Sequence, residues 1–205
     1  RFEAGHYDLF VITRPKNKVL FTSCGFYPLA ETQSVLMLEN RKNGLERFYS
    51  AFLPEFPENH GNTLTGGVGC IVMNCNPFTK GHLALITYAA SRCSLLHIFV
   101  EEDRSLFPFE VRMRLVKEGT AHLPNVKVHP SGPYMISSAT FPTYFLKKGE
   151  DAARIQSELD ITLFASRIAP LFHITKRFAG EEPLDPVTRD DNEAMIRLLP
   201  QYSSS

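Results

Sequence analysis

The sequence predicts an α/β fold built around a parallel sheet, and two observations support this prediction. Between residues 66 and 205, strand-like apolar runs alternate with helix-like stretches. The first of these runs, 69–74, is continuously apolar, as expected for a strand that is buried on both faces. Alternation of this kind implies right-handed βαβ units, whose ligands bind at the carboxyl ends of the strands.

Local signals justify the elements of this part in order. Leu83, Ile86 and Ala90 recur at helical spacing after the first strand, and Pro108 stands just before the second helical pattern. Thr188 and Asp191 form an N-cap pair before the last one. We therefore expect strands at 69–74, 95–100, 126–129, 161–164 and 174–178, and helices at 81–92, 109–121, 149–159 and 189–199.

A smaller segment precedes these elements. Proline, glycine and short polar residues gather after residue 53, which predicts a linker at 54–65 between a segment at 1–53 and another at 66–205. In the first segment, strand-like runs at 8–13 and 35–39 flank a short helix at 19–26, which Gly25 ends in the left-handed conformation. So short a segment is marginally stable alone and must pack either on the second segment or on residues that precede it.

Composition narrows the functional classes. The formal net charge is zero, which argues against a nucleic-acid-binding protein with a broad basic surface. No apolar run is long enough to cross a membrane, and the first six residues contain no signal-peptide core. Cys24, Cys70, Cys75 and Cys93 form no CxxC pair, which favours reduced thiols in a cytoplasmic protein over one disulfide in a secreted protein.

The most informative stretch joins the first strand of the second segment to the next helix. Backbone N–H groups and the helix dipole at such a junction favour an anion, and Gly81 lets a bulky anion approach closely. Thr79 and His82 offer donors to phosphate oxygens, and Lys80 adds positive charge. Each residue alone has a structural explanation, such as an Asn-Pro turn or a surface histidine. Together they favour a phosphate site: Asn74-Cys75-Asn76-Pro77-Phe78-Thr79-Lys80-Gly81-His82.

Several charged or polar residues leave two interpretations open. Lys176 and Arg177 follow a buried strand and either meet phosphate at its end or form a solvated pair. Ser137 and Ser138 either cap a helix that runs through Phe145 or contact an acceptor or phosphate.

For several other charged residues and for two histidines, structural roles compete with functional ones. The carboxylates at 101–103 either assist Mg²⁺ or cap the next helix, with capping favoured. Arg112 and Arg114 either face that region or form a solvent-facing stripe. His97 and His129 show no metal-ligand spacing, so we expect them to be structural and predict no metal site made by the protein.

The TxGH sequence at 79–82 resembles the (H/T)xGH signature of the α/β nucleotidyltransferase superfamily. The wider context resembles the citrate lyase ligase family in three stretches, 72–82, 136–147 and 176–183, and the likeness covers about 65–202. This resemblance implies a Rossmann-like nucleotidyltransferase domain at 66–205, preceded by the C-terminal part of a GNAT-like α+β domain at 1–53. It also implies a chain truncated at both ends, because a late ISxSxxR-type phosphate motif is expected after Tyr202.

The resemblance also implies a function. A bacterial, cytoplasmic ligase of this kind uses ATP and Mg²⁺ to join acetate to the thiol of the acyl-carrier subunit of citrate lyase, through acetyl-adenylate, without nucleic acid or membrane partners. His82, Thr79 and Lys80 would act in catalysis, with Lys176 or Arg177 neutralising charge and Ser137 or Ser138 contacting the acceptor or phosphate. The remaining ATP contacts would be Asn74, Cys75, Asn76, Pro77, Phe78 and Gly81.

Two alternatives remain open from the sequence. One is a nucleotidyltransferase that adenylylates a phosphate acceptor such as pantetheine phosphate. Met73 counts against it, because such enzymes commonly have glycine at that position. The other is an inactive, truncated module that binds a carrier protein.

Overall fold

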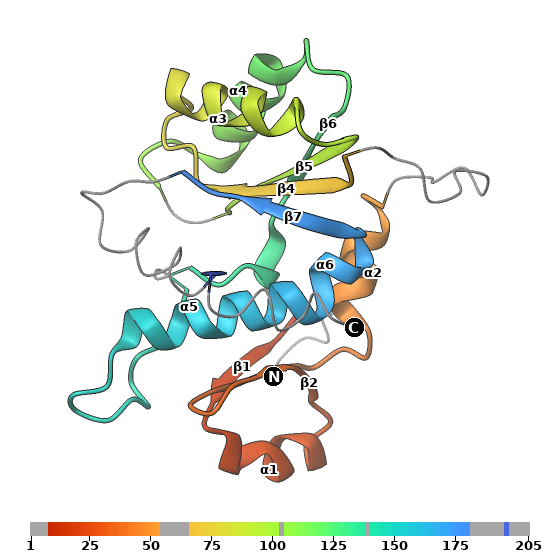
Figure 1. The fold of residues 1–205 in the computed structure, drawn as a ribbon. Helices are drawn as coiled ribbons and strands as arrows, with labels where there is room; N and C mark the ends of the chain where they lie inside the picture. Colours follow the sequence, from red (N-terminus) through yellow and green to blue (C-terminus); the bar gives the residue numbers. More distant parts are fainter. Residues whose placement is uncertain (1–7, 54–65, 103–104, 138–139, 181–194, 197–205) are drawn as a thin grey trace.

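The computed structural model describes residues 8–53, 66–102, 105–137, 140–180 and 195–196, and these residues form two sheets (Figure 1). The larger sheet is parallel, with strand order β6-β5-β4-β7. The smaller is antiparallel, with order β1-β3-β2. The strands are β1 (Phe10–Thr13), β2 (Tyr27–Glu31), β3 (Leu36–Glu39), β4 (Val68–Met73), β5 (Leu95–Val100), β6 (Val126–Pro130) and β7 (Ile174–Phe178).

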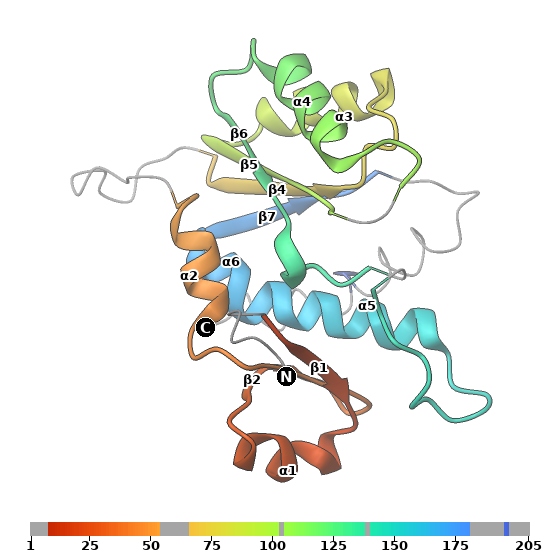
Figure 2. The same cartoon turned by 180° about the vertical axis from the view of Figure 1, so that it is seen from behind.

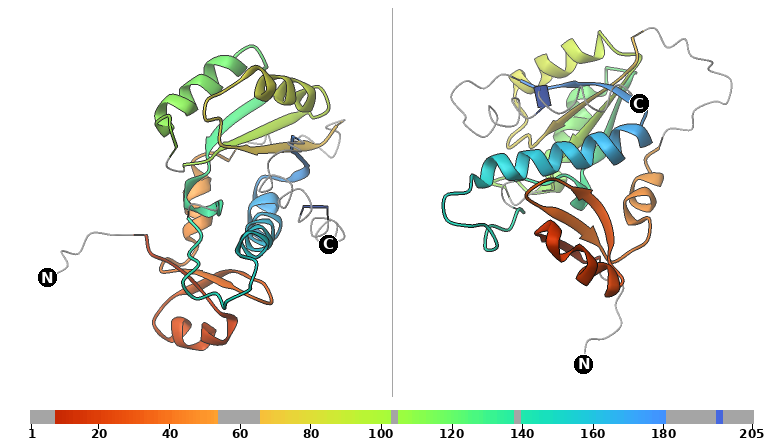
Figure 3. Two further views of the ribbon diagram at one scale, coloured as in Figure 1. Left: turned by 90° about the vertical axis from the view of Figure 1, so that its left-hand side faces the viewer. Right: turned by 60° about the horizontal axis from the view of Figure 1, so that its bottom comes forward.

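The helices separate and cover these sheets in layers (Figure 3). Helices α3 and α4 cover one face of the parallel sheet, while α5 and α2 lie between its other face and the antiparallel sheet. The short helix α1 lies on the outer side of the antiparallel sheet. The bounds are α1 (Lys18–Ser23), α2 (Gly44–Ser50), α3 (Lys80–Ala90), α4 (Phe109–Thr120), α5 (Ala152–Leu163) and α6 (Ala169–Leu171), with 3-10 turns η1 (Pro15–Asn17) and η2 (Gly132–Tyr134).

Most elements expected from local patterns are present. Four of the five expected strands of the second segment form the parallel sheet, and the first two helices form α3 and α4. The short helix of the first segment forms as α1, and Gly25 after it has φ of +86°, as expected. Strand β2 and helix α2 were not predicted.

The strand expected at 161–164 is wrong. Helix α5 begins at Ala152, where the Asp151 side chain caps it, and runs through Leu163 into the π-helical turn η3 (Phe164–Ile168). This helix lies between the two sheets and buries apolar residues on several sides, including Ile161 and Leu163. A short apolar run inside such a helix cannot be told from a strand by periodicity.

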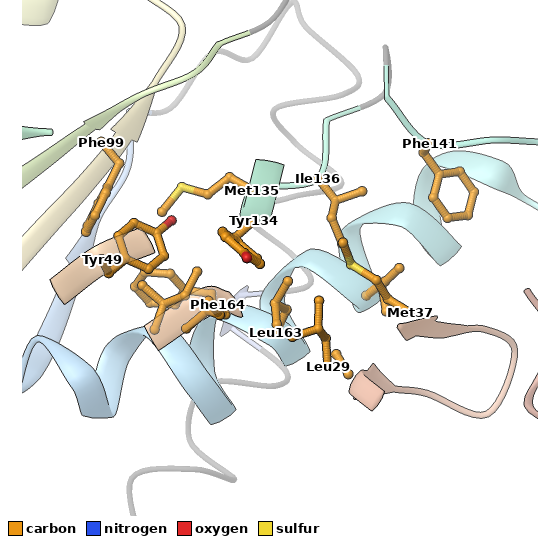
Figure 4. Packing of buried hydrophobic residues seen from close by; sticks show 14 of the residues in the cluster. Leu29, Met37, Tyr49, Phe99, Tyr134, Met135, Ile136, Phe141, Leu163 and Phe164 are labelled. Carbon is orange, nitrogen blue, oxygen red and sulfur yellow. The ribbon is translucent and has the colours of Figure 1, made fainter. Parts of the chain in front are cut away.

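The two segments share one hydrophobic core (Figure 4). Tyr49 of α2 packs edge-on against Phe99 of β5, with ring centroids 6.0 Å apart, and against Phe172, at 5.3 Å. Leu29 and Met37 of the antiparallel sheet belong to the same buried cluster. Of the two packing partners considered for the first segment, the second segment therefore supplies this contact.

Polar contacts also join the segments across this core. The Tyr49 hydroxyl donates to the Ser131 carbonyl oxygen at 2.7 Å, and the Tyr134 hydroxyl donates to the Glu39 carboxylate at 2.9 Å. The Arg167 guanidinium lies 2.6 Å from the Glu46 carboxylate. The linker at 54–65, and the helix at 189–199 except for residues 195–196, lie outside the described residues, so the division of the chain stays a prediction.

The described residues bear on two further expectations. All four cysteines carry free thiols, and only Cys24 is exposed. Among the described helices, none is both long and apolar enough to cross a membrane.

Candidate active site

The candidate site lies where the strand order of the parallel sheet reverses. Strand β5 pairs with one edge of β4, and β6 pairs with the far edge of β5. The next strand in the chain, β7, pairs with the opposite edge of β4 (Figures 1 and 2). Helix α3, which follows β4, and helix α5, which precedes β7, lie on opposite faces of the sheet. Ligands of open α/β sheets bind in the crevice at such a switch point, and the loop at 74–79 lies there.

Thr79 and His82 hold each other at the start of α3. Thr79 is the N-cap, and its hydroxyl oxygen accepts from the His82 backbone N–H at 3.4 Å. The His82 Nδ1 atom accepts from the Thr79 backbone N–H at 3.0 Å and lies 2.9 Å from the Thr79 hydroxyl oxygen. Because Nδ1 is an acceptor, the neutral ring carries its proton on Nε2 and presents that atom as a donor.

Phe78 supports this arrangement from the side. Its ring stacks on the His82 ring, with centroids 6.0 Å apart and planes 14° apart. A Cβ atom on Gly119 of α4 would come within 2.4 Å of the Phe78 ring. Phe78 therefore fills the space between the His82 imidazole and α4, a packing role that keeps the imidazole in place.

Arg112 of α4 donates side-chain hydrogen bonds that hold the loop after β4 in place. Its side chain is fully buried, and it donates to the backbone carbonyl oxygen of Asn74, to the Asn74 side-chain oxygen at 2.8 Å and to the Phe107 carbonyl oxygen at 3.1 Å. The two arginines considered together in the sequence therefore differ. Arg112 is buried, and Arg114 is exposed to solvent. One sequence signal was available, because Arg112 lies four residues before the buried Val116 on the same helical face.

Asn74 and Asn76 tie two loops together. The Asn74 side-chain oxygen also accepts from the Ser105 hydroxyl at 3.0 Å, and the Asn76 side-chain oxygen accepts from the Phe107 backbone N–H at 3.0 Å. These oxygens therefore connect the loop after β4 to the loop after β5. Both side chains therefore hold the shape of the loop after β4.

The other loop residues divide into packing and exposed groups. Cys75 is buried with φ of +54°, and burial raises the pKa of its thiol to about 12, so it is a neutral packing group. The Asn76-Pro77 peptide bond is cis. Lys80 and Gly81 are exposed, and a Cβ on Gly81 would meet only the Thr79 hydroxyl oxygen at 3.6 Å. The protein itself therefore leaves room above Gly81.

Lys176 and Arg177 are not brought to this loop, and the expectation that they follow the end of a strand is wrong. They lie inside β7, opposite Gly69 and Cys70 near the start of β4. The Lys176 ammonium donates to the carbonyl oxygens of Gly66 and Arg92, at the amino edge of the sheet. The Arg177 guanidinium lies on the other face, 3.8 Å from the Asp160 carboxylate and 4.5 Å from the centre of the Phe164 ring.

The remaining candidates lie near the ends of β5 and β6. The described residues between Ser137 and Phe145 form no helix, so of the two roles left open for Ser137, helix capping is excluded, while Ser138 lies outside the described residues. The Glu102 carboxylate accepts from the Gly132 backbone N–H at 3.1 Å, so it caps the turn after β6 and not the helix after β5. No group of three or more His, Cys, Asp or Glu side chains that could hold a metal ion occurs in the part of the chain that the structure describes.

A parallel α/β sheet whose switch-point loop opens a helix with TxGH defines the class of nucleotidyltransferase-like folds. Residues 68–204 match the family model described as the citrate lyase ligase C-terminal domain. The chain therefore belongs to the citrate lyase ligase family, as the sequence resemblance predicted.

Individual relatives agree with this assignment. The chain is 41% identical to the [Citrate [pro-3S]-lyase] ligase of Klebsiella pneumoniae over 200 residues, which cover 97% of this chain and 57% of the relative. It is 42% identical to the [Citrate [pro-3S]-lyase] ligase of Escherichia coli (strain K12) over 196 residues, 95% of this chain and 54% of that protein. The chain thus spans about half the length of these curated relatives.

A more distant match lies in a second enzyme class. The phosphopantetheine adenylyltransferase of Corynebacterium glutamicum (strain R) is 38% identical over 69 residues, which cover 32% of this chain and 43% of that protein. The shorter coverage limits this similarity to part of the chain.

Proposed function

We propose that this chain catalyses ATP-dependent ligation of acetate to a carrier-bound thiol, the reaction that would activate citrate lyase. The family and the names of its relatives support the substrate assignment. The proposal includes a division into a GNAT-like segment at 1–53, a linker at 54–65 and a nucleotidyltransferase-like segment at 66–205. The antiparallel and parallel sheets on either side of the linker support that division.

One observation carries the proposal: the reciprocal Thr79–His82 pair at the switch point. In the first step, an acetate oxygen attacks the α-phosphorus of ATP, the bond to the β-phosphate oxygen breaks, and pyrophosphate leaves with the electron pair. Negative charge is redistributed over the phosphoryl oxygens as this occurs. The His82 Nε2–H would donate to these oxygens, and the exposed Lys80 at the same helix start would neutralise part of the charge.

The site needs no general base for this step. Acetate is already ionised near neutral pH, because carboxyl pKa values lie near 4. Mg²⁺ would arrive on the phosphates of ATP, which is its usual mode of binding at phosphoryl-transfer sites.

The second step transfers the acetyl group. The carrier thiol attacks the carbonyl carbon of acetyl-adenylate, a carbon–sulfur bond forms, and the carbon–oxygen bond to AMP breaks. AMP leaves with that electron pair, and the thiol proton passes to water. The products are a thioester and AMP.

The test is ATP–pyrophosphate exchange with Mg²⁺, measured with and without acetate. Exchange that appears only with acetate is the expected result, because formation of acetyl-adenylate is reversible. Exchange without acetate but with pantetheine phosphate would support the second candidate, a phosphate-acceptor adenylyltransferase, which the Corynebacterium glutamicum match favours. Absence of exchange under all conditions would contradict both and leave the inactive carrier-binding module.

A further inference from the structure

A cavity of about 380 Å³ lies between the antiparallel sheet and the ends of β5 and β6. Its two walls come from segments far apart in the sequence. Phe10, Ile12 and Met37 line it from the antiparallel sheet, and Glu102, Ser131 and Met135 line it from the other side. Neither segment alone would enclose this space.

The cavity lies at the carboxyl edge of the parallel sheet. The loop at 74–79 that leads into the TxGH sequence, called the TxGH loop below, lies at the same edge. The Ser131 backbone N–H donates to the Val100 carbonyl oxygen at 2.9 Å, and the Glu101 backbone N–H donates to the Met73 carbonyl oxygen at 3.1 Å. These bonds continue the strand pairing beyond β6, β5 and β4. Because neighbouring strands are about 4.8 Å apart, Ser131 lies about 10 Å from the start of the TxGH loop.

The end of the cavity near the sheet is polar and held in place. The Ser131 hydroxyl accepts from the Glu102 backbone N–H at 3.2 Å and donates to the Gly132 carbonyl oxygen at 3.1 Å. Gly132 has φ of +59°, and a Cβ there would come within 2.4 Å of the Phe48 ring. The first segment therefore packs directly against the turn that forms this end.

The walls farther from the sheet are mainly apolar. Met37 and Ile136 come from opposite segments and lie near each other at one end of the shared cluster (Figure 4). Thr140, farther along the chain after β6, also lines the cavity and is exposed. The space thus opens to solvent at Thr140 and at Glu102, and its apolar walls lie beside polar groups at the carboxyl edge of the sheet.

We propose that this cavity binds the thiol-bearing arm of the acceptor, so that the antiparallel sheet of the first segment forms one wall of the acceptor site. This inference rests on the proposed function. Acetate is too small to need a space of this size, and the nucleotide is expected at the switch point between β4 and β7. A volume near the lower end of the usual range for ligand sites fits one slender chain. A pantetheine-like arm is mostly aliphatic, with amide groups and a terminal thiol. Its aliphatic part suits the apolar walls, and its amide groups suit the polar groups near Ser131.

A fluorescence experiment tests binding without depending on catalysis. The chain contains no tryptophan, so a Phe10→Trp variant carries one reporter in the cavity wall. Pantetheine is the probe, and we expect it to shift the emission of this variant in a saturable way. Phe21→Trp, on α1 of the same segment, is the matched control and should not respond. An unchanged emission of Phe10→Trp at millimolar pantetheine would overturn the proposal.

A kinetic experiment separates the two steps. Met37→Trp fills the cavity from the first segment, and Thr140→Trp narrows its exposed end, where a large side chain is tolerated. We expect the ratio of acetyl transfer to pantetheine over acetate-dependent pyrophosphate exchange to fall about tenfold or more in both variants. Leu20→Trp, an exposed position on α1, should leave the ratio unchanged.

The outcomes distinguish the two proposals. An unchanged ratio in Thr140→Trp would overturn the acceptor cavity even if Met37→Trp failed to fold. If the wild-type chain shows no acetate-dependent exchange and the Phe10→Trp variant nevertheless binds pantetheine, the proposed function is overturned and the cavity remains an arm-binding site.

Discussion

The two faces of the parallel sheet are built in different ways. Helices α3 and α4 cover one face, where their Ile86 and Val116 pack with aliphatic strand residues such as Ile71 of β4, and nearly all of that cluster lies between residues 71 and 128. The other face meets α2, α5 and the antiparallel sheet, and its cluster draws on residues from 10 to 174. That second face is rich in aromatic rings, and the buried pair His97 and His129 adjoins them.

This difference separates two tasks. The aliphatic face shapes the TxGH loop, because α3 presents His82 and α4 supplies Arg112. The aromatic face joins the two segments and encloses the proposed acceptor cavity. Changes on the first face should therefore affect adenylate formation, and changes on the second should affect stability or acetyl transfer.

The largest effect is expected at His82, on the aliphatic face. His82→Ala removes the Nε2–H donor and should lower the turnover of acetate-dependent pyrophosphate exchange by about 100-fold or more, the loss typical of one key electrostatic donor. His122→Ala, an exposed histidine beyond the end of α4, is the matched control and should have no effect. A decrease below about threefold for His82→Ala would remove His82 from the mechanism.

Acid should destabilise the aromatic face. The His97 Nδ1 atom lies 2.8 Å from the His129 Nε2 atom, and burial lowers the pKa of His97 to about 3 and of His129 to about 4. In the unfolded chain both pKa values return to about 6.5, so the unfolded state binds more protons as the pH falls below that value. The free energy of unfolding should therefore decrease by up to about 2 kcal/mol for each histidine between pH 6.5 and 5.

Urea unfolding at several pH values measures this acid effect. His97→Gln keeps a polar side chain that does not titrate, and it should flatten the pH dependence between pH 6.5 and 5. His122→Gln replaces an exposed histidine outside this cluster and is the matched control. Equal pH dependence in wild type and His97→Gln would assign the acid sensitivity to other groups.

Arg112 tests whether the loop depends on α4. Arg112→Lys keeps the charge but replaces two spaced donors, the Nε atom that bonds to Phe107 and the Nη1 atom that bonds to Asn74, with one ammonium nitrogen. We therefore expect kcat/KM for ATP in the exchange assay to fall about tenfold. Arg114→Lys, two residues away on the same helix and exposed, is the control and should not change it. Wild-type kinetics in Arg112→Lys would show that the loop keeps its shape without the guanidinium hydrogen bonds to Asn74 and Phe107.

The smallest effect is expected from a single hydrogen bond between the segments. Tyr49→Phe removes the buried bond to the Ser131 carbonyl oxygen and should lower the free energy of unfolding by about 1 kcal/mol. Tyr27→Phe, a more exposed tyrosine in the same segment, should change it little. A fully neutral Tyr49→Phe would indicate that apolar packing alone joins the segments on the aromatic face.

The elements around the aliphatic face could be predicted because their signals are local. A continuous apolar run marked β4, helical spacing of Leu83, Ile86 and Ala90 marked α3, and Pro108 marked the start of α4. The TxGH loop was found the same way, since nine consecutive residues contain the strand end, the turn and the helix start. Neighbours in sequence are neighbours in space at such a junction.

Only the tertiary structure decided the rest. The apolar run at 161–164 is helical because α5 packs between the two sheets and therefore buries side chains on more than one side, Ile161 and Leu163 among them. Lys176 was assigned to the wrong edge because the register of β7 against β4 depends on pairing between strands about 100 residues apart. The cavity likewise needs Phe10 and Met37 beside Ser131. Local periodicity specifies which face of an element is buried, but not which distant segment buries it, and that choice comes from packing.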